Sequence, residues 1–276
     1  MDGRRPGVGP PYHAAMRGWR NAAFAVLSIA ARTLDLAGRA LLYLAAGVLR
    51  RHALTEAITR TWDEFSRNDA AILSGLMPWE KAWYERVLKP ADHILLVGCG
   101  SGRDLIALLE LGYRVEGLDI SARAIELARR MLERRRLSAE LHIGSIEDVV
   151  IPGSFDAVIF SWFCYGYIPH RQTRIAVLRN VTPHLKPGGR VLISYVPAEG
   201  TPRFLPIGLT RLATRLTRSD WRPELGDVLG PITADRRSVR YEHMFAEGEL
   251  ESEARAAGLT VVFHERSEVG TAILML

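Results

Sequence analysis

Three glycines at alternate positions follow a short apolar run and form the strongest chemical signal in the chain. The run covers residues 94–97 (Ile-Leu-Leu-Val), and Gly98, Gly100 and Gly102 come directly after it. A continuous apolar run is typical of a strand covered on both faces. Glycines leave a turn without side chains, so that a ligand can approach backbone N–H groups at the start of the next helix, whose dipole favours a carboxylate or phosphate. The pattern predicts a nucleotide-type binding site without specifying the nucleotide.

An acid and a polar loop further along the chain complete this predicted site. Asp119 ends a second predicted strand and lies 21 residues after Gly98. This is the placement of a carboxylate that accepts hydrogen bonds from ribose hydroxyls. After a third predicted strand, we expect an adenine to lie against Ile146, with Ser145 or Glu147 near its amino group.

Strands that alternate with helices position these groups. Apolar runs predict five strands, at residues 94–97, 114–119, 140–143, 155–160 and 190–195. With helical patterns between them and a closing antiparallel hairpin, residues 260–264 and 271–275, they predict an α/β fold with a doubly wound, mostly parallel seven-stranded sheet. Ligands bind beyond the carboxyl ends of such strands. We therefore expect Ser161 and the other segments that follow strand ends to face one crevice.

Four segments in a fixed order carry a family resemblance. They are residues 97–102 (Val-Gly-Cys-Gly-Ser-Gly), 117–121 (Gly-Leu-Asp-Ile-Ser), 155–158 (Phe-Asp-Ala-Val) and 185–192 (Leu-Lys-Pro-Gly-Gly-Arg-Val-Leu). Over residues 90–196 the chain resembles class I S-adenosylmethionine-dependent methyltransferases. The resemblance implies S-adenosylmethionine as the cofactor, with the glycines near its methionine portion and the acid on its ribose. The residues implied to bind it are Val97, Gly98, Gly100, Gly102, Asp119, Ile120, Ser145, Ile146 and Ser161.

Two positions near the glycine loop separate this resemblance from related patterns. The family often has an acid two residues before the first glycine, where this chain has Leu96, as in the branch that resembles thiopurine and halide methyltransferases. A dinucleotide-binding loop would need a glycine where Arg103 stands. The spacing therefore favours the methyltransferase form over the dinucleotide form.

Histidines and tyrosines are the candidate catalytic residues. Methyl transfer from a sulfonium has a neutral leaving group, so that the protein mainly has to align the nucleophile and exclude water. A general base would add about 10²–10⁴-fold for a hydroxyl or protonated amine. His170, after the fourth predicted strand, and His243, at the start of the last predicted helix, are the candidate bases, with structural roles as the alternative. Tyr165, Tyr167 and Tyr195 are candidates for lining the acceptor pocket or for core packing.

The resemblance implies a methyltransferase, and we expect a small-molecule or lipid-like acceptor, the lipid-like class because of the apolar stretch that precedes the domain. Two alternatives remain open: a cofactor-binding scaffold without catalysis, and an RNA- or protein-modifying methyltransferase recruited by a basic arm. Against nucleic acid as partner, residues 161–164 (Ser-Trp-Phe-Cys) stand where many nucleic-acid amino methyltransferases carry Asn-Pro-Pro-Tyr. The formal net charge of +5 is modest and is typical of a solvated face.

The predicted domain covers residues 53–276, and the chain before it has a different composition. Residues 1–20 carry arginines among glycines and prolines and predict a mobile basic arm. The rest of the extension, up to residue 52, is largely apolar and predicts a helix with a narrow polar stripe, along which Arg32, Asp35 and Arg39 can pair.

This apolar stretch fits neither a signal peptide nor a simple transmembrane helix. One interpretation is peripheral contact of residues 17–51 with a membrane surface, helped by flanking arginines. The other is packing on the domain or on a second subunit of an oligomer. An insertion at residues 197–243, rich in proline, is expected to cover the acceptor pocket.

The cysteines bear on compartment and metal content. Cys99 and Cys164 are the only two, lie far apart and lack metal-ligand spacing. They predict a reduced, cytoplasmic compartment and no metal site. Membrane contact would place the protein at the inner face of the membrane.

Overall fold

A long N-terminal helix and a doubly wound domain make up the protein. The computed structural model describes residues 12–65, 74–149, 151–199, 204–230 and 237–276, and contacts divide the chain into two units, residues 1–42 and 43–276. Helix α1 spans Tyr12–Val48 and belongs to the first unit up to residue 42.

The first unit partly corrects the sequence prediction. The predicted mobile arm extends to residue 20, but the helix already begins at Tyr12, because residues 14–17 (Ala-Ala-Met-Arg) are good helix formers. Residues 1–11 of that arm lie outside the described residues. The predicted ion pair is present, with 3.0 Å between Arg39 Nε and Asp35 Oδ2. Among the described helices, none combines the length and the apolar character needed to cross a bilayer.

The second unit is built on a seven-stranded sheet with the order β3-β2-β1-β4-β5-β9-β8. Its strands are β1 (His93–Val97), β2 (Arg114–Asp119), β3 (Leu141–Ile143), β4 (Phe155–Phe160), β5 (Leu185–Tyr195), β8 (Thr260–Arg266) and β9 (Gly270–Met275). β1 to β5 run parallel, and β9 is antiparallel to both β5 and β8. The predicted fold class and edge hairpin are therefore confirmed.

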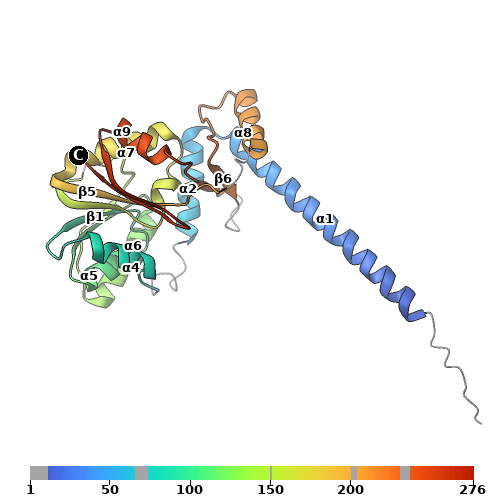
Figure 1. The fold of residues 1–276 in the computed structure, drawn as a ribbon, viewed down its shortest axis with the longest axis horizontal. Coiled ribbons are helices and arrows are strands. Elements are labelled where there is room, and N and C mark those ends of the chain that lie inside the picture. Colours follow the sequence, from blue (N-terminus) through green and yellow to red (C-terminus); the bar gives the residue numbers. More distant parts are fainter. Residues whose placement is uncertain (1–11, 66–73, 150, 200–203, 231–236) are drawn as a thin grey trace, which may run out of the picture. The chain divides into compact units, whose positions relative to one another are not determined.

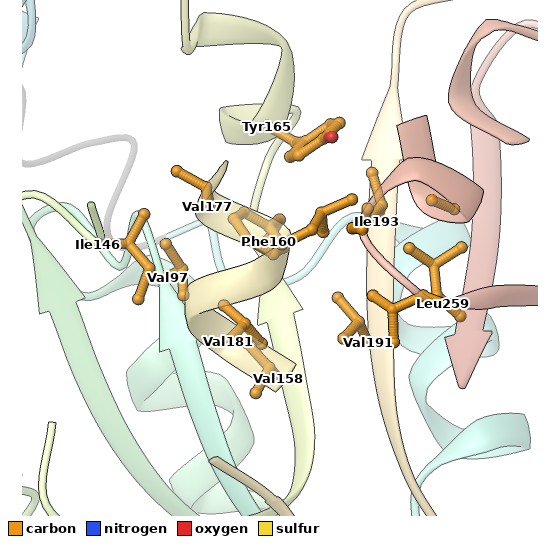
Figure 2. Close-up of a cluster of buried hydrophobic side chains, with 14 of the residues drawn as sticks. Val97, Ile146, Val158, Phe160, Tyr165, Val177, Val181, Val191, Ile193 and Leu259 are labelled. Atoms are coloured by element: carbon orange, nitrogen blue, oxygen red, sulfur yellow. The ribbon is translucent and has the colours of Figure 1, made fainter. Parts of the chain in front are cut away.

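Helices cover both faces of this sheet (Figure 1). The helices of this unit are α2 (Arg51–Phe65), α4 (Pro78–Val87), α5 (Arg103–Glu110), α6 (Ala122–Arg135), α7 (Arg171–Val181), α8 (Phe204–Thr217) and α9 (Glu249–Ala256). Those that cover the sheet are α4, α5, α6, α7 and α9. On one face α4, α5 and α6 bury side chains such as Trp83 and Ile125 against Leu96. On the other face α7 and α9 bury Val177 and Leu250. Figure 2 shows the second cluster, in which valines of the helix meet valines of the strands.

Local sequence signals set several of the element ends. Ser121 begins α6 by accepting a hydrogen bond from the Ala124 N–H at 3.0 Å, which satisfies one of the unpaired donors of a first helical turn. Gly112 ends α5 with a φ of +87°, a conformation that glycine adopts without penalty.

Two predicted elements differ from the structure. β5 begins at Leu185, five residues before the predicted strand 190–195, because a register shift opposite β4 accommodates the left-handed Gly188 without ending the strand. His243 ends strand β7 (Arg240–His243), which pairs with β6 (Asp227–Gly230), and does not begin a helix. Its segment buries alternate residues, which is the period of a strand.

The contact between Gly270, at the start of β9, and the ring of Tyr195 provides a test of the packing of the sheet. A Cβ at Gly270 would lie 2.2–2.5 Å from ring atoms of Tyr195, whose hydroxyl is held 2.5 Å from Nε2 of His264. Overpacking costs about 1–3 kcal/mol, so we expect Gly270→Ala to lower the free energy of unfolding by about 2 kcal/mol in urea titrations. Gly230→Ala is the control, since no described atom lies within 4 Å of the added methyl group. Equal stability of the two variants would contradict the prediction.

Candidate functional site

A cavity of about 350 Å³ lies where the carboxyl ends of the parallel strands meet. Its walls come from the segments that follow β1, β2, β3 and β4, as predicted, and from one face of α2. The predicted cofactor residues on its walls are Val97, Gly98, Gly100, Asp119, Ile120, Ser145, Ile146 and Ser161. Gly102 is not on the wall: it begins α5 with a φ of +101°, and a Cβ there would lie 3.4 Å from Ala128.

The glycine loop uses its own N–H groups internally. Gly98 and Cys99 both donate to the carbonyl oxygen of Leu118, at 2.8 and 3.1 Å, and Gly102 donates to Cys99. The N–H groups of Gly98, Cys99 and Gly102 therefore hold the shape of the loop, and the approach of a ligand to N–H groups at the start of α5 stays a prediction. At Gly98 a Cβ would lie 2.8 Å from Cys164 Sγ, whereas at Gly100 a Cβ would point into open space.

Asp119 holds the glycine loop against the end of β2. One carboxylate oxygen accepts the Gly100 N–H at 2.7 Å and the other accepts the Ser121 N–H at 2.8 Å. Burial raises the pKa of Asp119, and the two N–H groups act in the opposite direction. Each oxygen can accept a further hydrogen bond, so the carboxylate can meet ligand hydroxyls on the cavity side.

A second acid on the cavity wall was missed by sequence reasoning. Leu96, in place of the acid common in the family, is buried in the core and is not part of the wall. Asp104 is on the wall: one carboxylate oxygen accepts the hydroxyl of Ser161 and the other lies 2.5 Å from Arg103. The only signal in the sequence was an acid in the first turn of the helix after the loop, which is also the ordinary composition of a helix start.

Arg103 connects this acid to the N-terminus of α4. Its guanidinium lies 2.6 Å from Glu80 and 4.2 Å from the ring centroid of Trp162. Glu80 also accepts the N–H of Met77 at 2.7 Å and so begins α4. Burial, with the charge of Asp104 adding to it, raises the pKa of Glu80 to about 7. Arg103 and Asp104 therefore lie on the cavity wall, and Glu80, which is buried and not on the wall, pairs with Arg103.

Apolar side chains form the opposite wall. Ile58 and Trp62 of α2 line it, and the Trp62 ring lies 4.5 Å from that of Tyr167. Trp162 and Phe163 have φ values of +43° and +61°, a conformation that costs energy in residues other than glycine and is found at functional sites. None of the described residues of the predicted covering segment, 197–243, lines the cavity, and residues 200–203 and 231–236 of that segment lie outside the described residues.

The three candidate catalytic residues lie outside the wall of the cavity. His170 begins α7, where its Nδ1 accepts the N–H of Gln172 at 3.3 Å. Tyr165 is fully buried and donates to Glu253 at 2.8 Å. His243 is buried between two carboxylates. Of the tyrosines predicted for the acceptor side, Tyr167 is on the wall and Tyr195 is not.

His243 belongs to a buried network of charges. Its Nδ1 lies 2.8 Å from Asp227 and its Nε2 lies 3.0 Å from Glu249. Although burial opposes charging, these two carboxylates raise the pKa of His243 to about 9. Arg174, also buried, pairs with Glu253 at 2.7 Å and with Glu224 at 3.0 Å. The network ties β6 and β7 to α7 and α9, and its two cations already supply the positive charge that a metal ion would bring.

The sheet order and the walls of the cavity define the class of protein. An open, doubly wound sheet with a glycine loop after β1 and an acid at the end of β2 is an α/β domain that binds a nucleotide-type cofactor. A model of the methyltransferase domain matches residues 94–189 of the chain.

Curated relatives and solved structures narrow this class. The dTDP-3-amino-3,6-dideoxy-alpha-D-glucopyranose N,N-dimethyltransferase of Streptomyces fradiae is 30% identical over 63% of this chain and 72% of its own. A ubiquinone biosynthesis O-methyltransferase of Xanthomonas campestris pv. campestris is 31% identical over 45% of this chain, and the chain spans 56% of that relative's length. A structure of a SAM-dependent methyltransferase from Methanosarcina mazei has the same fold, with a TM-score of 0.56 and 22% identity over 72% of this chain and 97% of that one. The chain belongs to the class I S-adenosylmethionine-dependent methyltransferases, as its motifs predicted.

The pKa of His243 gives a pH-dependent prediction. Because the folded value of about 9 lies above the ordinary 6.5, the charge stabilises the fold fully below pH 6.5, and this contribution is lost as the pH rises through about 9. We expect His243→Gln, which carries no charge, to be less stable than the wild type, with a difference that shrinks between pH 6.5 and 9 in urea titrations. A difference that is constant over this range would contradict the assignment.

Proposed function

We propose that this protein transfers the methyl group of S-adenosylmethionine to a small-molecule acceptor by in-line displacement. One observation carries the proposal: a single cavity joins the glycine loop, Asp119 and the segment of Ser145 and Ile146 to an apolar, aromatic wall. The polar end suits an amino acid joined to a nucleoside, and the apolar end can hold an acceptor while it excludes water. The S. fradiae relative, named for an amino sugar, supports a small acceptor.

The chemistry of the walls fits the cofactor. Asp119 would accept the ribose hydroxyls, and Ile120 and Ile146 would lie along the adenine. At the opposite end, Asp104 would hold the ammonium group of the methionine portion, and Arg103 would hold its carboxylate. In this scheme Asp104 would bind the ammonium group in place of the acid that the family often has at the position of Leu96. When bound, the cofactor supplies the electrophilic methyl group.

The residues around the acceptor wall favour alignment over proton transfer. Burial raises the pKa of Tyr167 above its usual range, so that its hydroxyl stays protonated and acts as a hydrogen-bond donor. A neutral amine needs no base to attack a sulfonium. Holding nucleophile and methyl group in line can supply about 7–11 kcal/mol of such a barrier. The wall formed by Ile58, Trp62 and Tyr167 would therefore contribute position and a dry environment.

Contact with a membrane surface through residues 17–51, at the inner face of a cytoplasmic membrane, is a second part of the proposal. Within the first unit, apolar side chains of α1 are largely exposed, Phe24 and Leu34 to 73% each. Exposed apolar side chains on a helix that also carries arginines are typical of interfacial helices. This contact would favour an acceptor that is itself lipid-like.

Binding of S-adenosylhomocysteine, the demethylated product, tests the cofactor site. Loss of a hydrogen bond to a charged group costs about 1.5–3 kcal/mol, so we expect Asp119→Ala to weaken binding about 10- to 100-fold in isothermal titration. Asp148→Ala, which removes an exposed acid outside the cavity, is the control and should bind like the wild type. A wild-type protein without affinity would refute the cofactor assignment. Transfer of a labelled methyl group from the cofactor to the small molecules of a host extract tests the activity itself. Cofactor binding without such transfer would favour the alternative of a cofactor-binding scaffold without catalysis.

Vesicle binding tests the exposed face of α1. Placing charge on apolar interfacial residues opposes insertion, so we expect Phe24→Glu with Leu34→Glu to lower the partition of the protein onto phosphatidylglycerol-containing vesicles about tenfold. Leu111→Glu, at an exposed position 44% accessible at the end of α5, is the matched control. Equal sedimentation of both variants with vesicles would exclude the contact.

A further inference from the structure

Helix α8, in the second unit, exposes three leucines on one face. Leu205, Leu212 and Leu216 are 79%, 50% and 76% exposed. Their spacings of seven and four residues place them on one face of the helix. The buried face carries Ile207, Thr210 and Ala213. Because the helix already has this buried face, the exposed leucines form a second apolar face, which calls for a partner.

The close approach of a neighbouring helix fixes this orientation. At Gly47, near the end of α1, a Cβ would lie 2.6 Å from the carbonyl oxygen of Thr210 and 2.7 Å from the Cβ of Ala213. The hydroxyl of Thr217 also donates to the carbonyl oxygen of Gly47 at 3.2 Å. Only small side chains fit at such a separation of two backbones, so α8 cannot rotate its leucines into this contact.

The charges beside the leucines are all positive. Arg211 and Arg215 of α8, and Arg218 just after it, are exposed, and residues 204–217 contain no acid. In the part of the chain that the structure describes, none of the three arginines forms an ion pair with a carboxylate; Arg211 Nε donates to the carbonyl oxygen of Pro223 at 3.2 Å. The next acid in the sequence, Asp220, accepts the N–H of Arg51.

We propose that α8 docks on the surface of an anionic lipid bilayer. The leucine stripe (Leu205, Leu212 and Leu216) would enter the boundary between headgroups and acyl chains, and the arginines would meet the anionic headgroups. A bilayer satisfies both features of the face at once, because it offers an apolar layer directly beneath a layer of negative charge. The surface is separate from residues 17–42 of α1 and does not depend on methyl transfer.

Contacts connect this docking surface to the rim of the cavity. Directly after α8, Ser219 donates to the carbonyl oxygen of Leu49 at 2.5 Å, and Asp220 accepts the Arg51 N–H at 2.8 Å. The guanidinium of Arg51 lies 3.8 Å from Glu147, which is on the cavity wall. Docking would therefore hold the first turn of α2, and with it the rim, near the bilayer. That the acceptor then comes from the lipid phase is a step that rests on the proposed function.

The test uses the full chain and vesicles of phosphatidylcholine with or without phosphatidylglycerol. We expect the double variant Leu212→Glu and Leu216→Glu to partition onto the mixed vesicles about tenfold less than the wild type. The matched control, Leu111→Glu with Val262→Glu, adds the same charge at positions 44% and 55% exposed on other elements and should bind like the wild type. Replacing Arg211, Arg215 and Arg218 with glutamine should remove the preference for phosphatidylglycerol.

Three results would overturn the proposal. The first is a wild-type protein that does not bind the mixed vesicles, and the second is unchanged binding by the leucine variant. The third is a wild-type dimer that the leucine variant makes monomeric without a change in vesicle binding, which would assign the face to a second copy of the chain. S-adenosylhomocysteine binding by each variant, measured without vesicles, separates a failure of docking from a failure of the cofactor site or of folding.

Discussion

The carboxylate of Asp119 is the interaction on which the site depends. Two backbone N–H groups, from Gly100 and Ser121, point at it and tie the glycine loop to the end of β2. Without this tie, the Gly100 end of the loop would lose its hydrogen bond to β2, and the bonds from Gly98 and Cys99 to Leu118 would hold only the beginning of the loop. One acid therefore shapes the loop and also presents its remaining lone pairs to a ligand.

The glycines of the loop matter because they have no side chains. A side chain at Gly98 would meet Cys164, so the loops after β1 and β4 can approach only because that position is bare. Burial of the loop N–H groups in internal hydrogen bonds has a further consequence. The polar side chains that the cavity wall offers to a ligand include Asp119, Asp104 and Arg103, and in the proposed function the apolar side chains of α2 contact the acceptor.

The sequence was sufficient for the fold class and for the positions of the strands, because most strands are continuous apolar runs between clear helix starts and ends. Eight of the nine residues that the resemblance implied for cofactor binding line the cavity, since fixed motifs follow the strands. The sequence was insufficient for Asp104 and Glu80, whose importance comes from contacts between α4 and α5. The contact between Glu80 and Arg103 joins positions 23 residues apart, and periodicity carries no information about it.

The histidines show why a chemical residue type is a weak guide to catalysis. His243 has a raised pKa and acidic neighbours, as a catalytic base would, yet those neighbours are what keep it charged, and a charged imidazole cannot accept a proton. The same two carboxylates bind it to α9 and to β6. The charge of His243 therefore holds the two-stranded sheet of β6 and β7 on the domain. A buried ion pair of this kind fixes position more than it adds stability, because desolvation offsets much of the attraction. The inserted segment can then carry α8 at a fixed place beside the first turn of α2.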